Sequence, residues 1–357
     1  MERLKQENYS GEAEGKKIGL WTLKNARGLE VAICNWGARV CQILAPDKNG
    51  KFDDVVLGYD TLADAMAGMP EMGAMIGLMA NRIANARFEL GGRTYELAAN
   101  DGAHNLHSGP VGCMNRVFDV VGSDERSVSL EIRLPDGTDG FPGNCVLTVV
   151  YTLNDDNGLE IKTEVATDAQ TIVNICNHAY FNLGGAEAQD ILGHVLELNA
   201  AHYTTADDTL IPTGEIAPVA GTPFDFTTPH VIGERIDSDN EQLRRGKGYD
   251  HNFVLNKPEG DVAVSFAARL SDPGTGRVME VWTTEPGIQL YTGNFIQSGG
   301  MQKKYVGKGG RVMPHRGALC LETQHFPDAV HHANFPSIVL NAGERYSSTT
   351  IYRFLTA

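Results

Sequence analysis

The chain has 357 residues with 45 acidic and 30 basic side chains, which gives a formal net charge of −15 at pH 7. This length fits two domains of ordinary size or one large all-β domain. The acidic balance, without any concentrated run of lysine and arginine, argues against nucleic acid as a partner. The first residues lack the apolar core of a signal peptide, and no uncharged apolar run reaches the roughly twenty residues that span a bilayer. We therefore expect a cytoplasmic protein with no membrane partner.

Strand patterns begin early in the chain. Residues 18–46 combine an apolar and polar alternation at 29–33, an Asn-Trp-Gly turn at 35–37 and an apolar segment at 40–44, an order typical of antiparallel hairpins. Residues 128–134 alternate strictly, which predicts a strand with one buried and one exposed face. Further strands are predicted at 55–57, 94–97, 145–153, 159–165, 262–270, 278–283, 338–340 and 350–354.

Helical patterns are few and short. They occur at 61–66, with Thr61 as the N-cap, and at 240–245, before Gly246. With 40 glycines and 15 prolines separating many short strands, the sequence predicts an all-β fold, a large antiparallel β-sandwich with a few short helices. No linker or shift in composition marks a boundary, so we expect one domain over residues 1–357, with 1–16 as a poorly structured lead-in.

The six cysteines form no Cys-x-x-Cys pair, and several lie within apolar strand patterns. Such thiols behave as small apolar side chains, so we expect all six to be reduced and buried. Cys176 and Cys320 have no cationic neighbour in the sequence that would make them reactive. We interpret both as packing residues.

One histidine and one glutamate stand out as candidates for proton transfer. His178 lies among amides and aromatic residues, directly after a strand-like segment, although a purely structural histidine is an alternative interpretation. Glu322 lies between Leu321 and Thr323 in an apolar strand pattern, where a carboxylate must find partners or shift its pKa upward. Together the two residues suggest an acid and a base that act on a polar substrate without a cofactor.

Several polar loops combine amides with a charged residue, a histidine or an aromatic ring. This mixture suits a sugar, because hydroxyl groups need paired donors and acceptors while the C–H faces of the ring pack against aromatic side chains. Any one of these loops could also be polar simply because it is exposed. The loops lie at 81–82, 104–109, 177–182, 249–252, 289–294 and 322–324.

Two histidine groupings raise the question of a metal site. His104 and His107 have His-x-x-His spacing, and residues 325–332 contain three histidines and one aspartate. A zinc site needs three or four converging ligands, and no His-Glu-x-x-His pattern is present, so we expect no metal. The glycine-rich segment 306–310 lacks the phosphate-loop signature and is predicted to be a flexible surface loop.

A series of short motifs resembles the aldose 1-epimerase, or galactose mutarotase, family. The motifs occur in the family's order and cover nearly the whole chain. They are Asn35-Trp36-Gly37-Ala38 with Pro46-Asp47, Asp54-Val55-Val56-Leu57-Gly58, Ala80-Asn81-Arg82-Ile83-Ala84, Asn105-Leu106-His107, Asn177-His178-Ala179-Tyr180-Phe181-Asn182-Leu183, Tyr249-Asp250-His251, Tyr291-Thr292-Gly293-Asn294 and Leu321-Glu322-Thr323-Gln324.

The resemblance implies a galactose-mutarotase-like β-sandwich, or supersandwich, and a cofactor-free interconversion of the α and β anomers of free hexoses such as glucose and galactose. By similarity, Glu322 is the base that removes the proton from the anomeric hydroxyl, and His178 is the acid that protonates the ring oxygen. By similarity, the residues that hold the sugar are Asn81, Arg82, His107, Asp250 and Gln289. A monomer or a weak homodimer is expected.

Two departures from the family's usual pattern put the preferred sugar in question. Leu78 stands where the family usually has an arginine, and the loop after His107 reads Ser-Gly-Pro-Val-Gly-Cys instead of the usual Gly-Gly and Gly-Phe pairs. A hexose-phosphate epimerase on the same fold is one alternative function, although it would call for clustered cations beyond Arg82. A non-catalytic sugar-binding sandwich is another, although it would not need both His178 and Glu322.

Overall fold

The largest sheet of the computed structural model contains nine strands, each paired antiparallel with its neighbours. The structure describes residues 2–258, 260–297 and 305–357. The C-terminal strand lies in the middle of this sheet, between strands that are far apart in the sequence. In sheet order the strands are β12 (Asp119–Ser123), β13 (Ser127–Leu134), β14 (Cys145–Leu153), β15 (Gly158–Thr167), β28 (Arg345–Thr356), β24 (Arg277–Thr283), β23 (Ser265–Asp272), β18 (Val195–Leu198) and β21 (His230–Val231).

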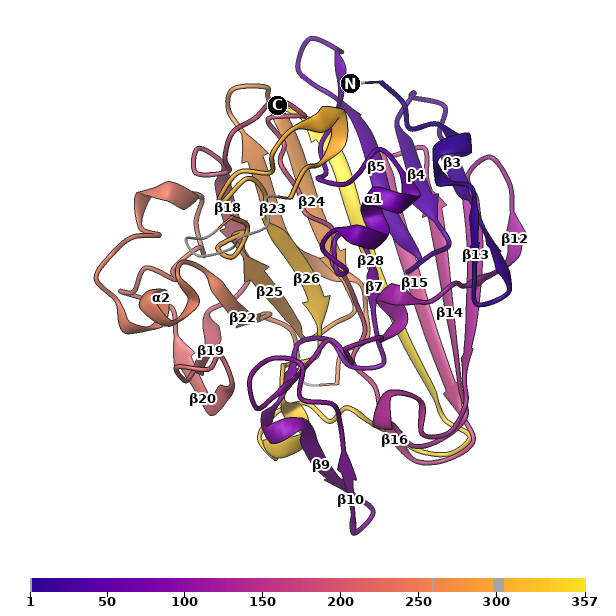
Figure 1. Ribbon diagram of the computed structural model, residues 1–357. Coiled ribbons are helices and arrows are strands. Elements are labelled where there is room, and N and C mark those ends of the chain that lie inside the picture. Colours follow the sequence, from indigo (N-terminus) through magenta and orange to yellow (C-terminus); the bar gives the residue numbers. More distant parts are fainter. Residues whose placement is uncertain (1, 259, 298–304) are drawn as a thin grey trace.

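Two smaller antiparallel sheets share one apolar core with the large sheet, which makes the fold a sandwich (Figure 1). Val31, Val149 and Ile288, from three different sheets, all belong to this core. The five-stranded sheet is β20 (Pro212–Pro218), β19 (His202–Ala206), β22 (Asp250–Val254), β25 (Gly287–Tyr291) and β26 (Cys320–Gln324). The four-stranded sheet is β3 (Leu20–Lys24), β4 (Glu30–Cys34), β5 (Arg39–Pro46) and β6 (Phe52–Asp54).

Short strand pairs complete the architecture, and Figure 1 shows the β9–β10 hairpin projecting at the opposite end of the molecule from the two termini. The pairs are β1 (Gly11–Ala13) with β2 (Lys16–Ile18), β7 (Met75–Ile76) with β17 (Cys176–Asn177), β8 (Arg82–Ile83) with β11 (Asn105–Leu106), β9 (Arg87–Leu90) with β10 (Arg93–Glu96), and β16 (Thr171–Ile172) with β27 (Val339–Leu340). The predicted all-β sandwich with a few short helices is confirmed.

Both predicted helices are present and both begin at a side-chain cap. The Thr61 side chain accepts a hydrogen bond from the backbone N–H of Asp64 at the start of α1 (Leu62–Ala67). The Asn240 side chain accepts bonds from two N–H groups at the start of α2 (Glu241–Gly246), which ends at Lys247 in a left-handed conformation. Neither helix, nor any other among the described residues, is long and apolar enough to cross a membrane.

The periodicity of side chains predicted the central strands well and two shorter segments poorly. Side chains in β13 and β14 alternate between buried and partly exposed positions, as the sequence pattern predicts. The strand predicted at 55–57 lies earlier in the chain, as β6, which ends at Asp54. The Asp54 side chain accepts hydrogen bonds from the backbone N–H groups of Ile43 and Val56, and this ends the regular pairing. The strand predicted from 262 begins at Ser265, because the Asp261 side chain turns the chain at Ala263.

The expectation of a poorly structured lead-in at 1–16 differs from what the structure shows. A short 3₁₀ helix at Gln6–Tyr9 leads into the β1–β2 hairpin. Tyr9 is buried, and its hydroxyl donates a 2.7 Å hydrogen bond to the carbonyl of Tyr59. Burial of one aromatic side chain anchors this segment, and sequence periodicity does not reveal a single anchor of this kind.

The prediction of a flexible surface loop at 306–310 is wrong at Lys308. Its ammonium group lies 2.6 Å from Asp54 Oδ2 and also donates a bond to the carbonyl of Val56. Both side chains of this ion pair are at most 5% exposed. The pair ties the segment before β26 to the end of β6, and breaking one half of it would leave the other charge buried.

We predict that Lys308→Met lowers the free energy of unfolding by about 3 kcal/mol, because the buried Asp54 side chain would lose its cationic partner. Urea unfolding followed by tryptophan fluorescence measures this loss. The double variant Asp54→Asn with Lys308→Met removes both charges and should recover part of it. A single variant as stable as the unmodified protein would contradict this account of the ion pair.

Candidate active site

An open pocket of about 700 Å³ contains His178 and Glu322 among its lining residues. This volume is in the range of small-molecule sites, and the lining mixes carboxyl groups, amides and aromatic rings. The sequence-predicted residues that line it are Asn81, Arg82, His107, His178, Asp250 and Glu322. Segments that are far apart in the sequence therefore meet in one place, as a site for a polar ligand requires.

Glu322 and His178 are held by different elements. Glu322 lies in β26, whose five residues are all buried, and pairs across the sheet with Gln289 in β25. His178 follows β17, and both its backbone groups are bonded, its N–H to the carbonyl of Ala74 and its carbonyl to the N–H of Gly73, each at 2.9 Å. The backbone that carries the imidazole is therefore held by hydrogen bonds and is not part of a free loop.

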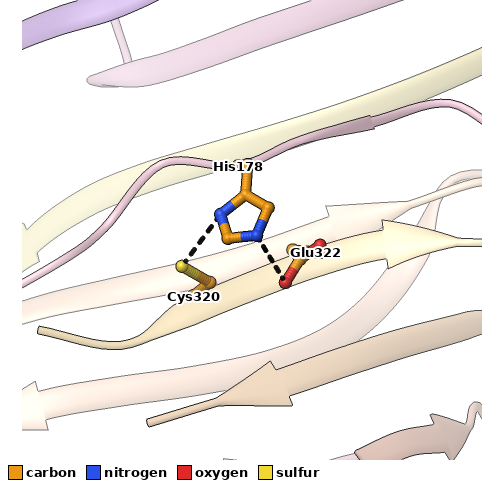
Figure 2. Close-up of side chains that lie close together, drawn as sticks. All are labelled: His178, Cys320 and Glu322. Carbon is orange, nitrogen blue, oxygen red and sulfur yellow. Dashed lines mark hydrogen bonds and ion pairs between the residues drawn. The ribbon is translucent and has the colours of Figure 1, made fainter. Parts of the chain in front are cut away.

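The two side chains face each other, with His178 Nε2 lying 3.6 Å from Glu322 Oε1 (Figure 2). Side chains two residues apart on a strand point to the same face, so Cys320 also reaches His178, and its Sγ lies 3.3 Å from Nδ1. Cys176 Sγ donates to Glu322 Oε2 at 3.4 Å. All six cysteines are free and buried, as predicted, but these two thiols do more than fill space.

Burial controls the charge of this pair. It raises the pKa of Glu322 to about 8, and the negative charge of Asp250 adds to that shift. Burial also lowers the pKa of His178 to about 4. The 3.6 Å contact is thus between a neutral carboxyl group and a neutral imidazole at pH 7, rather than between two ions. Apart from the N–H hydrogen that a neutral imidazole always carries, the pair holds one titratable proton. This proton lies on the carboxyl group.

Four of the five predicted sugar-holding residues reach the pocket. Arg82 forms a 2.8 Å ion pair with Asp101, and the backbone N–H of Asn81 donates to His107 Nδ1 at 3.1 Å. Gln289 is the exception, because it is buried behind the pocket surface. Its amide group donates a 2.7 Å hydrogen bond to Asp250 Oδ1, so it supports a lining residue.

Several pocket residues were missed by the sequence analysis. Tyr180 stacks on the His178 ring at 5.0 Å between centroids, and Tyr291 meets that ring edge-on at 6.3 Å. Glu71 also lines the pocket, and the Tyr180 hydroxyl donates to its Oε1 at 3.3 Å. Both tyrosines lie inside the quoted motifs, and this was the available signal. Glu71 gave none, because it stands alone in an ordinary turn.

Leu78, in place of the usual arginine, is buried in the core and does not line the pocket. This position therefore brings no second arginine to the site.

One group of side chains could in principle hold a metal ion, namely His178, Cys320 and Glu322, whose ligand atoms lie within 4.8 Å of one another. Within the described ranges, neither of the histidine groupings considered from the sequence forms such a group. The thiol and the carboxyl group face different nitrogens of one imidazole, so a single ion would require the ring to move. The expectation of no metal stays a prediction.

The antiparallel sandwich and its polar pocket, with a carboxyl group beside an imidazole, define a class of β-sandwich enzymes that move protons on polar substrates. The family model for aldose 1-epimerase matches residues 19–353. Galactose mutarotases from Sus scrofa and Homo sapiens are each 40% identical to the chain over 333 residues, which cover 92% of this chain and 92% of each relative. Aldose 1-epimerase from Escherichia coli K12 is 36% identical over 344 residues, 96% of both chains.

Solved structures agree with these relatives. An aldose epimerase homologue from C. elegans has a TM-score of 0.86 and 31% identity, covering 95% of this chain and 99% of that one. A galactose 1-epimerase from Lactobacillus acidophilus has a TM-score of 0.83 and 28% identity, covering 97% of each chain. The chain belongs to the aldose 1-epimerase family and is an isomerase.

Proposed function

We propose that this protein interconverts the α and β anomers of free hexoses such as glucose and galactose, with Glu322 and His178 as the catalytic acid–base pair. The observation that carries the proposal is the contact of these two buried side chains at the edge of an open polar pocket. The names of the relatives at 36% to 40% identity support the choice of reaction and of sugar.

Ring opening requires two proton transfers at the hemiacetal. Glu322, as the carboxylate, takes the proton of the anomeric hydroxyl while the C1–O5 bond breaks and C1 becomes a carbonyl carbon. His178, as the imidazolium, gives a proton to O5. Rotation about the C1–C2 bond turns the other face of the aldehyde toward O5, and the reverse transfers close the ring. Each positioned group contributes a factor of roughly 10² to 10⁴ to the rate.

The proton count fits this cycle. The pair holds one proton before opening, on His178, and one proton after opening, on Glu322. At pH 7 the proton lies on Glu322, which matches the state that closes the ring. Binding of the cyclic sugar must shift the proton to His178, and hydroxyl groups that donate to the carboxylate supply the required stabilisation.

His107 is suited to hold the sugar rather than to exchange a proton with it. A backbone N–H can only donate, so the bond from Asn81 makes His107 Nδ1 an acceptor. Burial, His178 and Arg82 together lower the pKa of His107, so the ring is neutral and carries its hydrogen on Nε2. That nitrogen can donate a hydrogen bond to a hydroxyl group but has no lone pair with which to accept a proton.

The remaining sugar-holding roles are proposed for Asn81, Arg82 and Asp250 directly and for Gln289 through Asp250. A phosphorylated sugar is disfavoured, since two of the three cations around the pocket, Arg82 and Arg245, are already paired with Asp101 and Asp208. The carboxyl groups are Glu71, Asp101, Asp208, Asp250 and Glu322, and the cations are Arg82, Arg245 and Lys247.

We further propose that the chain acts as one aldose 1-epimerase domain over residues 1–357, in the cytoplasm, without a cofactor and as a monomer or weak homodimer. A strand from the C-terminal end lies in the middle of the nine-stranded sheet, which supports a single folding unit. The six free thiols suit a reducing compartment.

Polarimetry on freshly dissolved α-glucose and α-galactose, with a metal chelator present, tests the proposed reaction. We expect the unmodified protein to accelerate the approach to anomeric equilibrium, and to act less well on glucose 6-phosphate. Glu322→Gln keeps the shape but cannot accept a proton, so its rate should fall at least about 100-fold while the protein stays folded. Equal rates for this variant and the unmodified protein would refute the role of Glu322, and restoration by a metal of activity lost on chelation would refute the cofactor-free mechanism.

The pH profile should depend on the pair's single proton. We expect kcat/KM to fall above about pH 8, where Glu322 loses the proton and nothing is left to protonate O5. On the acid side it should fall below about pH 4, where both groups are protonated. Because Asp250 raises the pKa of Glu322, Asp250→Asn should move the alkaline limb to lower pH, whatever it does to the maximal rate. An alkaline limb that does not move would contradict this electrostatic coupling.

His178 and His107 should respond differently to the same substitution. His178→Asn should lower kcat strongly, by about 100-fold or more, because an amide cannot transfer a proton. His107→Asn should raise KM at least as clearly as it lowers kcat. Initial rates against sugar concentration measure both effects, and the opposite pattern would require the two roles to be exchanged.

A further inference from the structure

The thiol of Cys320 is one of two polar groups from β26 that contact the imidazole of His178 (Figure 2). The sulfur lies 3.3 Å from Nδ1, the ring nitrogen that does not face Glu322. Cys320 is fully buried and does not line the pocket, so it does not meet the sugar. Its contact with His178 therefore links it to the proposed reaction.

The direction of the hydrogen bonds around the pair can be traced from Cys176. Burial and the charge of Glu322 raise the pKa of the Cys176 thiol well above its usual range, so it carries its hydrogen and donates to Glu322 Oε2. Oε2 is thus occupied as an acceptor. The proton of the neutral carboxyl group then lies on Oε1, the oxygen that faces His178 Nε2.

This arrangement decides which nitrogen of His178 carries hydrogen. A protonated Oε1 at 3.6 Å from Nε2 favours a lone pair on that nitrogen, which places the hydrogen of the neutral ring on Nδ1, toward the Cys320 sulfur. We propose that Cys320 is a positioning residue that holds His178 as the Nδ1–H tautomer and so keeps Nε2 available for proton exchange with the sugar. The inference rests on the proposed function, in which Nε2 serves the ring oxygen.

Other histidines in the chain show why a thiol suits this position. His325 and His331 have carboxylate oxygens 2.6 Å from Nδ1, and the carboxylate raises the pKa of each imidazole. A carboxylate beside His178 would likewise retain the proton on the ring. His107, whose Nδ1 accepts from a backbone N–H, shows the opposite tautomer. A thiol accepts weakly, so it orients the ring without making it a weaker acid.

The same contacts serve both protonation states. When the proton moves from Glu322 to His178, Nδ1–H still points at Cys320 and the Cys176 thiol still points at Oε2, so neither buried donor loses its partner. The titratable groups that face or surround His178 are Cys320, Glu322, His107, Tyr180, Tyr291, Glu71 and Asp250.

Nitrogen-15 NMR of protein labelled at histidine tests the tautomer directly. In the unmodified protein at pH 7 we expect the neutral His178 ring to carry hydrogen on Nδ1 and His107 to carry it on Nε2, with His178→Asn and His107→Asn used to assign the signals. Observation of the Nε2–H tautomer at His178 would overturn the proposal. This measurement does not depend on activity, so it stands even if the protein proves inactive on free hexoses.

Kinetics of matched variants test the consequence. Cys320→Ala removes the acceptor, so the ring should shift toward the Nε2–H tautomer and kcat should fall about tenfold or more with KM nearly unchanged. Cys320→Ser keeps an acceptor and should retain the Nδ1–H signal and most of kcat. Cys145→Ala removes a buried thiol outside the site and should match the unmodified protein.

A loss of kcat in Cys320→Ala without any change of tautomer would assign Cys320 a packing role and overturn the proposal. Unchanged kcat together with an unchanged tautomer would also overturn it. If Cys320→Ala does not fold, the tautomer of the unmodified protein and of Cys320→Ser still decides the question. Failure of the unmodified protein to convert anomers would instead count against the proposed function.

Discussion

The burial of a carboxyl group and an imidazole side by side is the constraint on which the rest of the site depends. Burial disfavours the charged form of each group, so it moves the two pKa values in opposite directions and leaves one proton on the pair over a wide pH range. Two exposed side chains at the same separation would titrate close to their ordinary values. The enclosure of Glu322 and His178, rather than their identity alone, suits this pair to the proposed exchange of roles.

The strand that carries Glu322 has two different tasks on its two faces. Cys320 and Glu322 point toward His178, whereas Leu321 and Thr323 belong to the other face. The carbonyl of Leu321 accepts a 2.9 Å hydrogen bond from Tyr352, which lies in the central strand of the large sheet. Glu322 is thus attached to the most extensively paired part of the molecule through the strand that carries it.

The sequence predicted those features that depend on local patterns or on recognisable motifs. Strict alternation located β13, the Thr61 cap located the first helix, Gly246 marked the end of the second, and a lone carboxylate in an apolar strand pointed to Glu322. Features that depend on contacts between distant segments were not predictable. Tyr9 is anchored by Tyr59, Lys308 pairs with Asp54 across more than 250 positions, and Gln289 is placed behind Asp250 rather than in the pocket. Cys176 and Cys320 lie two residues from His178 and Glu322 in the sequence, but nothing local showed that each thiol would contact the side chain of the other segment.

A pair that begins and ends each passage with the same number of protons needs no exchange with bulk water between turnovers. Many acid–base sites must keep a path to solvent so that a spent acid can be recharged and a spent base discharged. In the proposed cycle the hydrogen taken from one oxygen of the sugar balances the one given to the other, so such a site can be sealed around Glu322 and His178 at no kinetic penalty. Reversibility follows from the same feature, since neither anomer meets a differently charged enzyme.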